Sequence, residues 1–252
     1  AWRQEMLKDF YSWWQTADKD IFAACQEVLS VQMWWQMGVQ VPFVPLAGIS
    51  RTGAAYDPPK QPKLLILRSA FWHLPAGRVF AAVTERFVAA TGGMMSLVWL
   101  GRYTHTIAMR DGGPQDSRWL SFDEMARHTC ALDVPAELSQ MKIRDVMGIG
   151  LPLISPERTW LLRLLHDMYR GWGQLHAEYS SERSSLTEGD WPHAPFYDPK
   201  VDPISRLSYW LELAEHFRFP HILHFVSLPE MIDMVLHTVR WPEVSVQLRA
   251  HH

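Results

Sequence analysis

The sequence predicts a helix-dominated α+β fold in which a small central sheet, at about residues 63–120, is flanked by N- and C-terminal helices. Three observations predict it. The 252 residues are 48% hydrophobic and 20% charged, which is typical of a chain that buries a core and excludes a disordered or coiled-coil one. Helical periodicity covers roughly half of the chain, against about a third in an average globular protein. Strand-like runs gather around one amphipathic helix in the middle of the chain, which indicates a small sheet with a covering helix.

We expect a single domain, 1–252, in which four parts follow one another: an N-terminal helical pair (1–38), an extended Pro-rich arm (39–62), a small α/β part (63–120) and a helical part (121–252). The helical pair is predicted at 2–15 and 18–37, and Gly38 ends it. The arm follows from its recurring prolines, which neither continue a helix nor join a central strand.

The α/β part begins with Lys63 to Ser69 (KLLILRS), a nearly all-apolar run that predicts a strand buried on both faces. A helix is expected at 76–91, and strands at 95–100 and 103–110. The apolar residues of that helix predict its inward face, which consists of Val79, Phe80, Val83, Phe87 and Ala90.

The last part carries several helix-start signals. The pairs Ser121–Glu124 and Ser227–Glu230 have the spacing of N-terminal capping boxes. Ser155, Pro156 and Glu157 offer a cap, a first-turn proline and an acid at the positive end of a helix. Further helices are expected at 135–147 and 202–217.

The sequence contains no catalytic signature. It has no GxSxG nucleophile turn, no phosphate-binding glycine loop and no CxxC pair, so we predict no catalytic residue and no cofactor. The two cysteines, Cys25 and Cys130, are too few for a disulfide framework, and we expect an intracellular, reducing compartment.

The densest titratable cluster consists of Glu212, His216, His221 and His224, with His237 further on. Neutral imidazoles and a carboxylate suit zinc and similar ions. However, Pro220 separates the two pairs, and there is no HExxH motif. Histidines that bridge helices through hydrogen bonds are the ordinary alternative, so we expect no bound metal.

Tryptophan (13 residues) and methionine (12 residues) are in surplus, and both are enriched at the centres of interfaces. Adjacent helical residues point about 100° apart, so one ring of each Trp–Trp pair is expected on a partner surface. The candidate interface residues are these two pairs and four prolines of the arm: Trp13, Trp14, Trp34, Trp35, Pro42, Pro45, Pro58 and Pro59.

The preferred hypothesis is therefore a non-catalytic accessory subunit that docks with other protein subunits of a large assembly. The formal net charge of −3 argues against a nucleic-acid partner. The uncharged stretch 28–50 contains Gly38, Pro42 and Pro45, so we expect no transmembrane span, only peripheral contact with a membrane complex.

The chain opens on Ala1 rather than Met, which fits a cleaved targeting peptide. We expect a mitochondrial setting on the matrix side, in a respiratory-chain or ATP-synthase-type complex. Two alternatives stay open: an enzyme with a His-rich site near 212–237, and a binder of an apolar small molecule.

Overall fold

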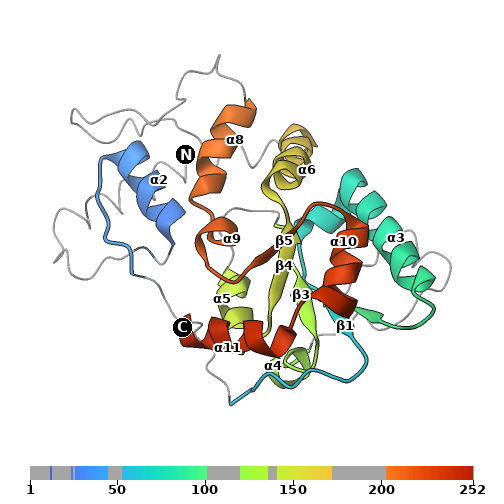
Figure 1. Cartoon of the computed structure of the whole chain (residues 1–252). Helices are drawn as coiled ribbons and strands as arrows, with labels where there is room; N and C mark the ends of the chain where they lie inside the picture. The colour runs from blue at the N-terminus through green and yellow to red at the C-terminus, as the bar shows by residue number, and fades with distance from the viewer. Residues whose placement is uncertain are drawn as a thin grey trace.

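The computed structural model describes residues 12, 24, 26–44, 53–100, 120–135, 141–171 and 203–251, and it confirms a helix-dominated fold with a small sheet (Figure 1). The sheet has five strands in the order β2-β1-β3-β4-β5, and every pairing is parallel. The strands are β1 (Lys63–Ile66), β2 (Ser96–Trp99), β3 (Cys130–Leu132), β4 (Leu153–Pro156) and β5 (Leu223–Phe225).

The sheet reaches beyond the expected 63–120. Strands β1 and β2 confirm the predictions at 63–69 and 95–100, whereas β3, β4 and β5 lie in the part that we expected to be helical. Strands β3 and β5 have three residues each, too few to show a strand periodicity, and β4 ends in residues that imitate a helix start. The expected strand at 103–110 lies outside the described residues.

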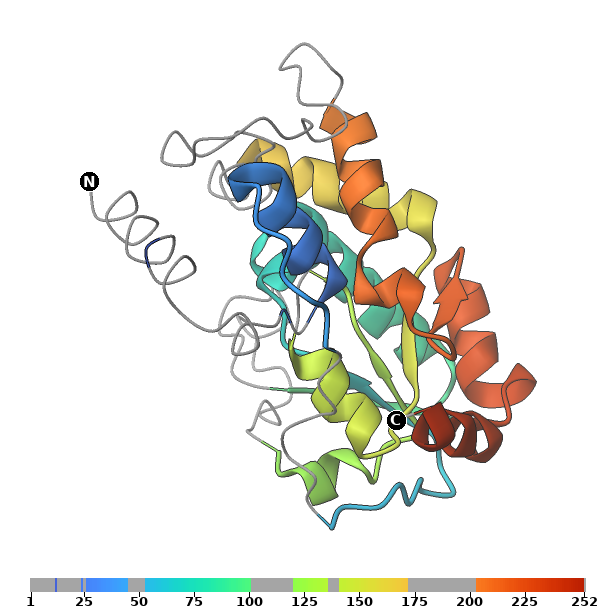
Figure 2. The ribbon, with the colours of Figure 1, turned by 90° about the vertical axis from the view of Figure 1, so that its left-hand side faces the viewer.

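The helices follow in chain order: α2 (Glu27–Met37), η2 (Ala70–His73), α3 (Pro75–Ala90), α4 (Phe122–Met125), α5 (Met141–Gly148), α6 (Arg158–Gly171), α8 (Pro203–Glu212), α9 (Glu215–Arg218), α10 (Leu228–Asp233), η4 (Met234–Thr238) and α11 (Trp241–His251). They cover both faces of the sheet (Figures 1 and 2). Residues of α3, α6, α8 and α10 pack with one face of the sheet, which includes Leu64, Leu132 and Ile154. Residues of α4, α5 and α11 pack with the opposite face, which includes Leu65 and Ala131.

The second helix of the N-terminal pair begins at Glu27 rather than at residue 18. Ala24 instead forms a parallel bridge with Phe43, and its N–H donates to the Pro42 carbonyl at 2.8 Å. Gln26 precedes the helix in extended conformation. Gly38 ends it at φ 69°, and the Gly38 N–H donates to the Trp34 carbonyl, as expected. Of the predicted helix at 2–15 the structure describes Ser12 alone.

Helix α3 lies within one residue of the predicted bounds at each end but has a different inward face. Phe80 is buried as expected, whereas the side chains of Val79 and Phe87 are 61% and 39% exposed. The reason is Gly77, because a Cβ built there would lie 1.9 Å from the Phe71 carbonyl oxygen. The backbone of α3 therefore approaches η2 along the Gly77 side, and this turns Val79 outward.

Two of the three helix-start signals are confirmed. The capping box of Ser121 is complete, and the Ser227 hydroxyl accepts from the Glu230 N–H at 3.3 Å. The third prediction is wrong, because Ser155 and Pro156 belong to β4. The carboxylate of Glu157 instead accepts from the Thr159 N–H at 2.8 Å, at the start of α6.

The structure describes two stretches of the expected arm, 39–44 and 53–62, and neither contains a helix or a named strand. Both contact the rest of the chain. The Ser30 hydroxyl of α2 donates to the Val41 carbonyl at 2.5 Å. The Tyr56 hydroxyl donates to the Thr129 carbonyl at 2.7 Å. Residues 45–52, between these two stretches, lie outside the described residues.

Candidate functional site

The strand order marks one place on the sheet where ligands bind in folds of this kind. From β1 the chain continues to β2 on one side and later to β3 on the other, so its direction across the sheet reverses between β1 and β3. In parallel sheets with helices on both faces, ligands bind outside the carboxyl ends of the strands at such a switch point. The residues that follow β1 and β3 are Leu67, Arg68 and Ser69 on one strand and Asp133 on the other.

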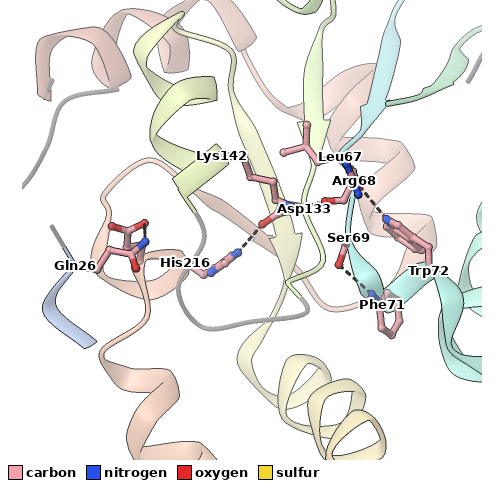
Figure 3. Close-up of polar contacts among 10 residues, drawn as sticks. Gln26, Leu67, Arg68, Ser69, Phe71, Trp72, Asp133, Lys142 and His216 are labelled. Carbon is pink, nitrogen blue, oxygen red and sulfur yellow. Dashed lines mark hydrogen bonds and ion pairs between the residues drawn. The ribbon is translucent and has the colours of Figure 1, made fainter. Parts of the chain in front are cut away.

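Asp133 is the centre of a buried polar cluster at this edge (Figure 3). Its backbone N–H donates to the Ile154 carbonyl at 3.0 Å, which fixes it at the end of β3. Its Oδ1 lies 2.9 Å from Nζ of Lys142 in an ion pair. Its Oδ2 lies 2.6 Å from Nε2 of His216 on α9. One carboxylate therefore joins β3 to two helices.

Lys142 connects the two strands at the switch point. It lies in the first turn of α5, and its ammonium group donates to the Arg68 carbonyl after β1 as well as pairing with Asp133 after β3. Its side chain is 29% exposed, whereas that of Asp133 is 2% exposed. A lysine ammonium has three N–H donors, so these two contacts leave one for another acceptor.

The segment after β1 is held in place by its own hydrogen bonds. The indole N–H of Trp72 donates to the Leu67 carbonyl at 2.9 Å, and the Ser69 hydroxyl accepts from the Phe71 N–H at 3.2 Å (Figure 3). Arg68 lies between them with an exposed side chain. The carbonyl that receives Lys142 and the guanidinium beside it therefore stand on a fixed backbone.

The charges of the cluster shift the pKa of Asp133. Burial by itself raises the pKa of a carboxyl group, but the Lys142 ammonium and the His216 ring together lower the pKa of Asp133 to about 2. Asp133 is therefore ionised at neutral pH. Its negative charge is balanced by Lys142, so the net positive charge at this edge of the sheet comes from the exposed Arg68.

A second buried network lies next to the first. Nε of Arg144, one helical position after Ile143 on α5, donates to Oε1 of Glu215 at 2.6 Å. Gln26 donates to the other carboxylate oxygen of Glu215 at 3.3 Å. Burial raises the pKa of Glu215, and Arg144 and Gln26 oppose this shift. The network binds the start of α2 to α9 and α5, and it holds α9 where His216 reaches Asp133.

The residues predicted as metal-ligand candidates contact different neighbours in the structure. Glu212 pairs with Arg158, at 2.5 Å between the charged atoms. His216 contacts Asp133, the His224 ring stacks on Phe217 with centroids 5.0 Å apart, and His221 lies in a turn with φ 72°. His237 is exposed. Across the described part of the chain, no group of three or more histidine, cysteine, aspartate or glutamate side chains is arranged to hold a metal ion.

Two candidate interface residues come together. Trp34 on α2 and Pro42 after it line one hollow of about 470 Å³. Phe43 and Val44, the next two residues, are 42% and 48% exposed although apolar. Pro58 and Pro59 are half-buried elsewhere on the chain. The predictions for Trp13, Trp14 and Pro45, and for the side chain of Trp35, fall outside the described residues.

Sequence reasoning found His216 but missed its partner Asp133 and the Lys142 that pairs with Asp133, and it treated Arg68 only as part of a strand. Asp133 directly follows the short apolar run Cys130–Leu132, and its position is informative only once this run is known to be a strand that ends at the switch point. No local signal existed for Lys142, because its importance follows from the pairing of β1 with β3.

Comparisons with known proteins add little. No protein-family model matches the chain, and no curated protein matches it. Among solved structures, a chain described as the glycotransferase of kitacinnamycin is similar at 14% identity with a TM-score of 0.30, over 82% of this chain and 44% of that one. This chain thus spans less than half of that protein's length, and a likeness at this level carries no argument about fold or function.

None of the described helices is long and apolar enough to cross a membrane.

Proposed function

We propose that the chain binds a phosphate-bearing small molecule, of which nucleotides are the first class to test, at the carboxyl edge of the sheet between β1 and β3. The observation that carries this proposal is the position of Lys142, whose ammonium is fixed by Asp133 and the Arg68 carbonyl at the switch point of the sheet. This function differs from the accessory-subunit role expected from the sequence and from both open alternatives, an enzyme with a His-rich site near 212–237 and a binder of an apolar small molecule.

The charge of the site supports an anionic ligand. The Asp133 carboxylate is buried and already engaged by Lys142 and His216, so its two oxygens are both directed into the protein. Lys142 remains partly exposed, and Arg68 adds a permanent positive charge. Ammonium and guanidinium groups are the side chains that bind phosphate in proteins.

The experiment measures, by isothermal titration calorimetry, the binding of nucleoside mono-, di- and triphosphates and of inorganic pyrophosphate to the purified chain. We expect at least one of them to bind with one molecule per chain. Replacement of Lys142 by Ala removes a charge-assisted contact of about 1.5–3 kcal/mol, so binding should weaken about tenfold or more.

The matched control is Lys60→Ala, because Lys60 is exposed and precedes β1 at the opposite, amino edge of the sheet. It should leave binding unchanged. No binding of any phosphate compound, or equal weakening by the two lysine variants, would contradict the proposal.

A second candidate function is docking of a partner protein, as an accessory subunit would require. The hollow lined by Trp34 and Pro42 and the exposed Phe43 and Val44 beside it favour this candidate, because aromatic side chains in hollows are typical binding hot spots. The mitochondrial setting in a membrane complex belongs to this second candidate function and not to the phosphate-binding one.

The test compares the native mass of the assembly that contains wild-type chain with that of Trp34→Ala and of Phe43→Ser. Loss of assembly without loss of folding in both variants would support docking at this surface. A native mass equal to that of the isolated chain in wild type would contradict it.

A further inference from the structure

Residues of α3, α6 and α10 line a groove on the face of the sheet opposite to the face that α5 covers. Its volume is about 520 Å³, within the roughly 300–1,000 Å³ that small-molecule sites occupy. Val79 and Val83 of α3 form one wall, and Trp160 and Leu164 of α6 form the other. Leu228, the first residue of α10, also lines it.

The side chains that line the groove are mostly apolar, of the kind that helices normally bury in a core. Val79 is 61% exposed, because the contact of Gly77 with η2 turns this side of α3 away from the core. Below it, the rings of Phe80 and Trp160 meet edge to face with centroids 6.0 Å apart. This contact holds two of the rings that line the groove against each other.

One charged side chain, Arg163, lines the groove among the residues that the structure describes there. It lies one turn after Trp160 on α6 and is exposed. A guanidinium group stays protonated at all physiological pH values and pairs with carboxylates through two parallel hydrogen bonds. An apolar body with an anionic head therefore complements this groove, whereas a cationic head would be repelled.

We propose that the groove binds a fatty-acid-like amphiphile, with its alkyl chain between α3 and α6 and its carboxylate on Arg163. This site is separate from the phosphate site, since α3 and α6 pack on one face of the sheet and α5, which carries Lys142, packs on the other. It also gives the sequence-based alternative of an apolar-ligand binder a place and a ligand class.

The test titrates the purified full chain with dodecanoate, dodecanol and dodecyltrimethylammonium below their micellar concentrations. Calorimetry gives the stoichiometry and the Kd of each probe. We expect one dodecanoate per chain, bound at least about tenfold tighter than the ammonium compound, as a single charge-assisted pair provides. Absence of dodecanoate binding overturns the proposal, and so does equal binding of the three probes, which would indicate an apolar surface for a protein partner.

Two variants and one control locate the site. Arg163→Gln should weaken dodecanoate about tenfold and leave dodecanol unchanged. Val79→Asp should weaken both, because it places a carboxylate in the groove at an exposed position that does not threaten folding. Arg86→Gln is the control, since Arg86 is exposed on α3 and is not part of the groove. If Arg163→Gln behaves as Arg86→Gln does, the proposal is wrong.

Discussion

The side chains of Asp133 and His216 lie 83 residues apart in the sequence and meet at 2.6 Å in the core, where each is no more than 2% exposed. This contact orients the carboxylate of Asp133 so that its other oxygen faces Lys142. His216 is thereby a positioning residue for the partly exposed Lys142 at the edge of the sheet, although it is itself too buried to touch a ligand.

Removal of the charge of Asp133 should destabilise the fold. Asp133→Asn keeps the size of the side chain but leaves Lys142 and His216 without their shared anion. Breaking a buried ion pair at one partner costs about 3–5 kcal/mol. Urea unfolding at neutral pH should show a loss of this order, and the exposed variant Asp233→Asn should lose less than about 0.5 kcal/mol. A loss of similar size in both variants would contradict the central role of Asp133.

The same carboxylate predicts how stability changes in acid. Its pKa is lowered in the folded chain to about 2, from 3.8 in the absence of structure. The unfolded chain therefore binds the proton more readily, so the stabilisation is complete above about pH 5, and most of it is lost as the pH falls from about 4 to about 2. The free energy of unfolding should drop by about 2 kcal/mol more in wild type than in Asp133→Asn over this range. Parallel curves for the two proteins would refute the assignment.

The close approach of α3 to η2 gives a prediction about packing. Gly77→Ala places a methyl group 1.9 Å from the Phe71 carbonyl oxygen, which is a backbone atom that cannot turn aside. We expect a loss of about 2 kcal/mol or more in the free energy of unfolding, as in other overpacked sites. Gly53→Ala is the control, because nothing lies within 4 Å of a Cβ at that position. Equal stability of the two variants would show that α3 does not contact η2 in this way.

The sequence predicts those elements of the fold that local residue patterns determine, and misses those that depend on contacts between distant parts of the chain. Strand β1 and the bounds of α3 follow from local apolar runs, and both were predictable. Strand β4 was not, because its last two residues, Ser155 and Pro156, imitate a helix start. The rotation of α3 depends on a contact of Gly77 with a different element, which periodicity alone does not contain.

The candidate site was less predictable than the fold. His216 stood out because histidines cluster near it in the sequence, and this suggested a metal site rather than a contact with a distant aspartate. The contact requires α9 to lie beside the end of β3, and the parallel pairing of β1 with β3 brings Arg68 to Lys142. Both are long-range relationships, which emerge only when the strand order is known.

The burial of His224 leads us to expect a second change of the free energy of unfolding with pH, at mildly acidic values. Burial lowers its pKa, and the nearby His216 lowers it further, while the Pro156 carbonyl and the Glu157 carboxylate oppose the shift. A histidine whose pKa is lowered by folding takes up its proton more readily in the unfolded chain. Its neutral ring therefore stabilises the fold above pH of about 6.5, and this stabilisation is lost as the pH falls below that value.

The variant His224→Phe should remove this dependence, because a phenyl ring can keep the stacking on Phe217 and cannot be protonated. Chemical unfolding of wild type at pH 7.5 and 5.5 should show a drop in stability that is smaller in His224→Phe. His237→Phe is the control, since His237 is exposed and should leave the drop unchanged. If the His224 variant keeps the full drop, the protonation that weakens the fold occurs at another group, and the assignment to His224 is wrong.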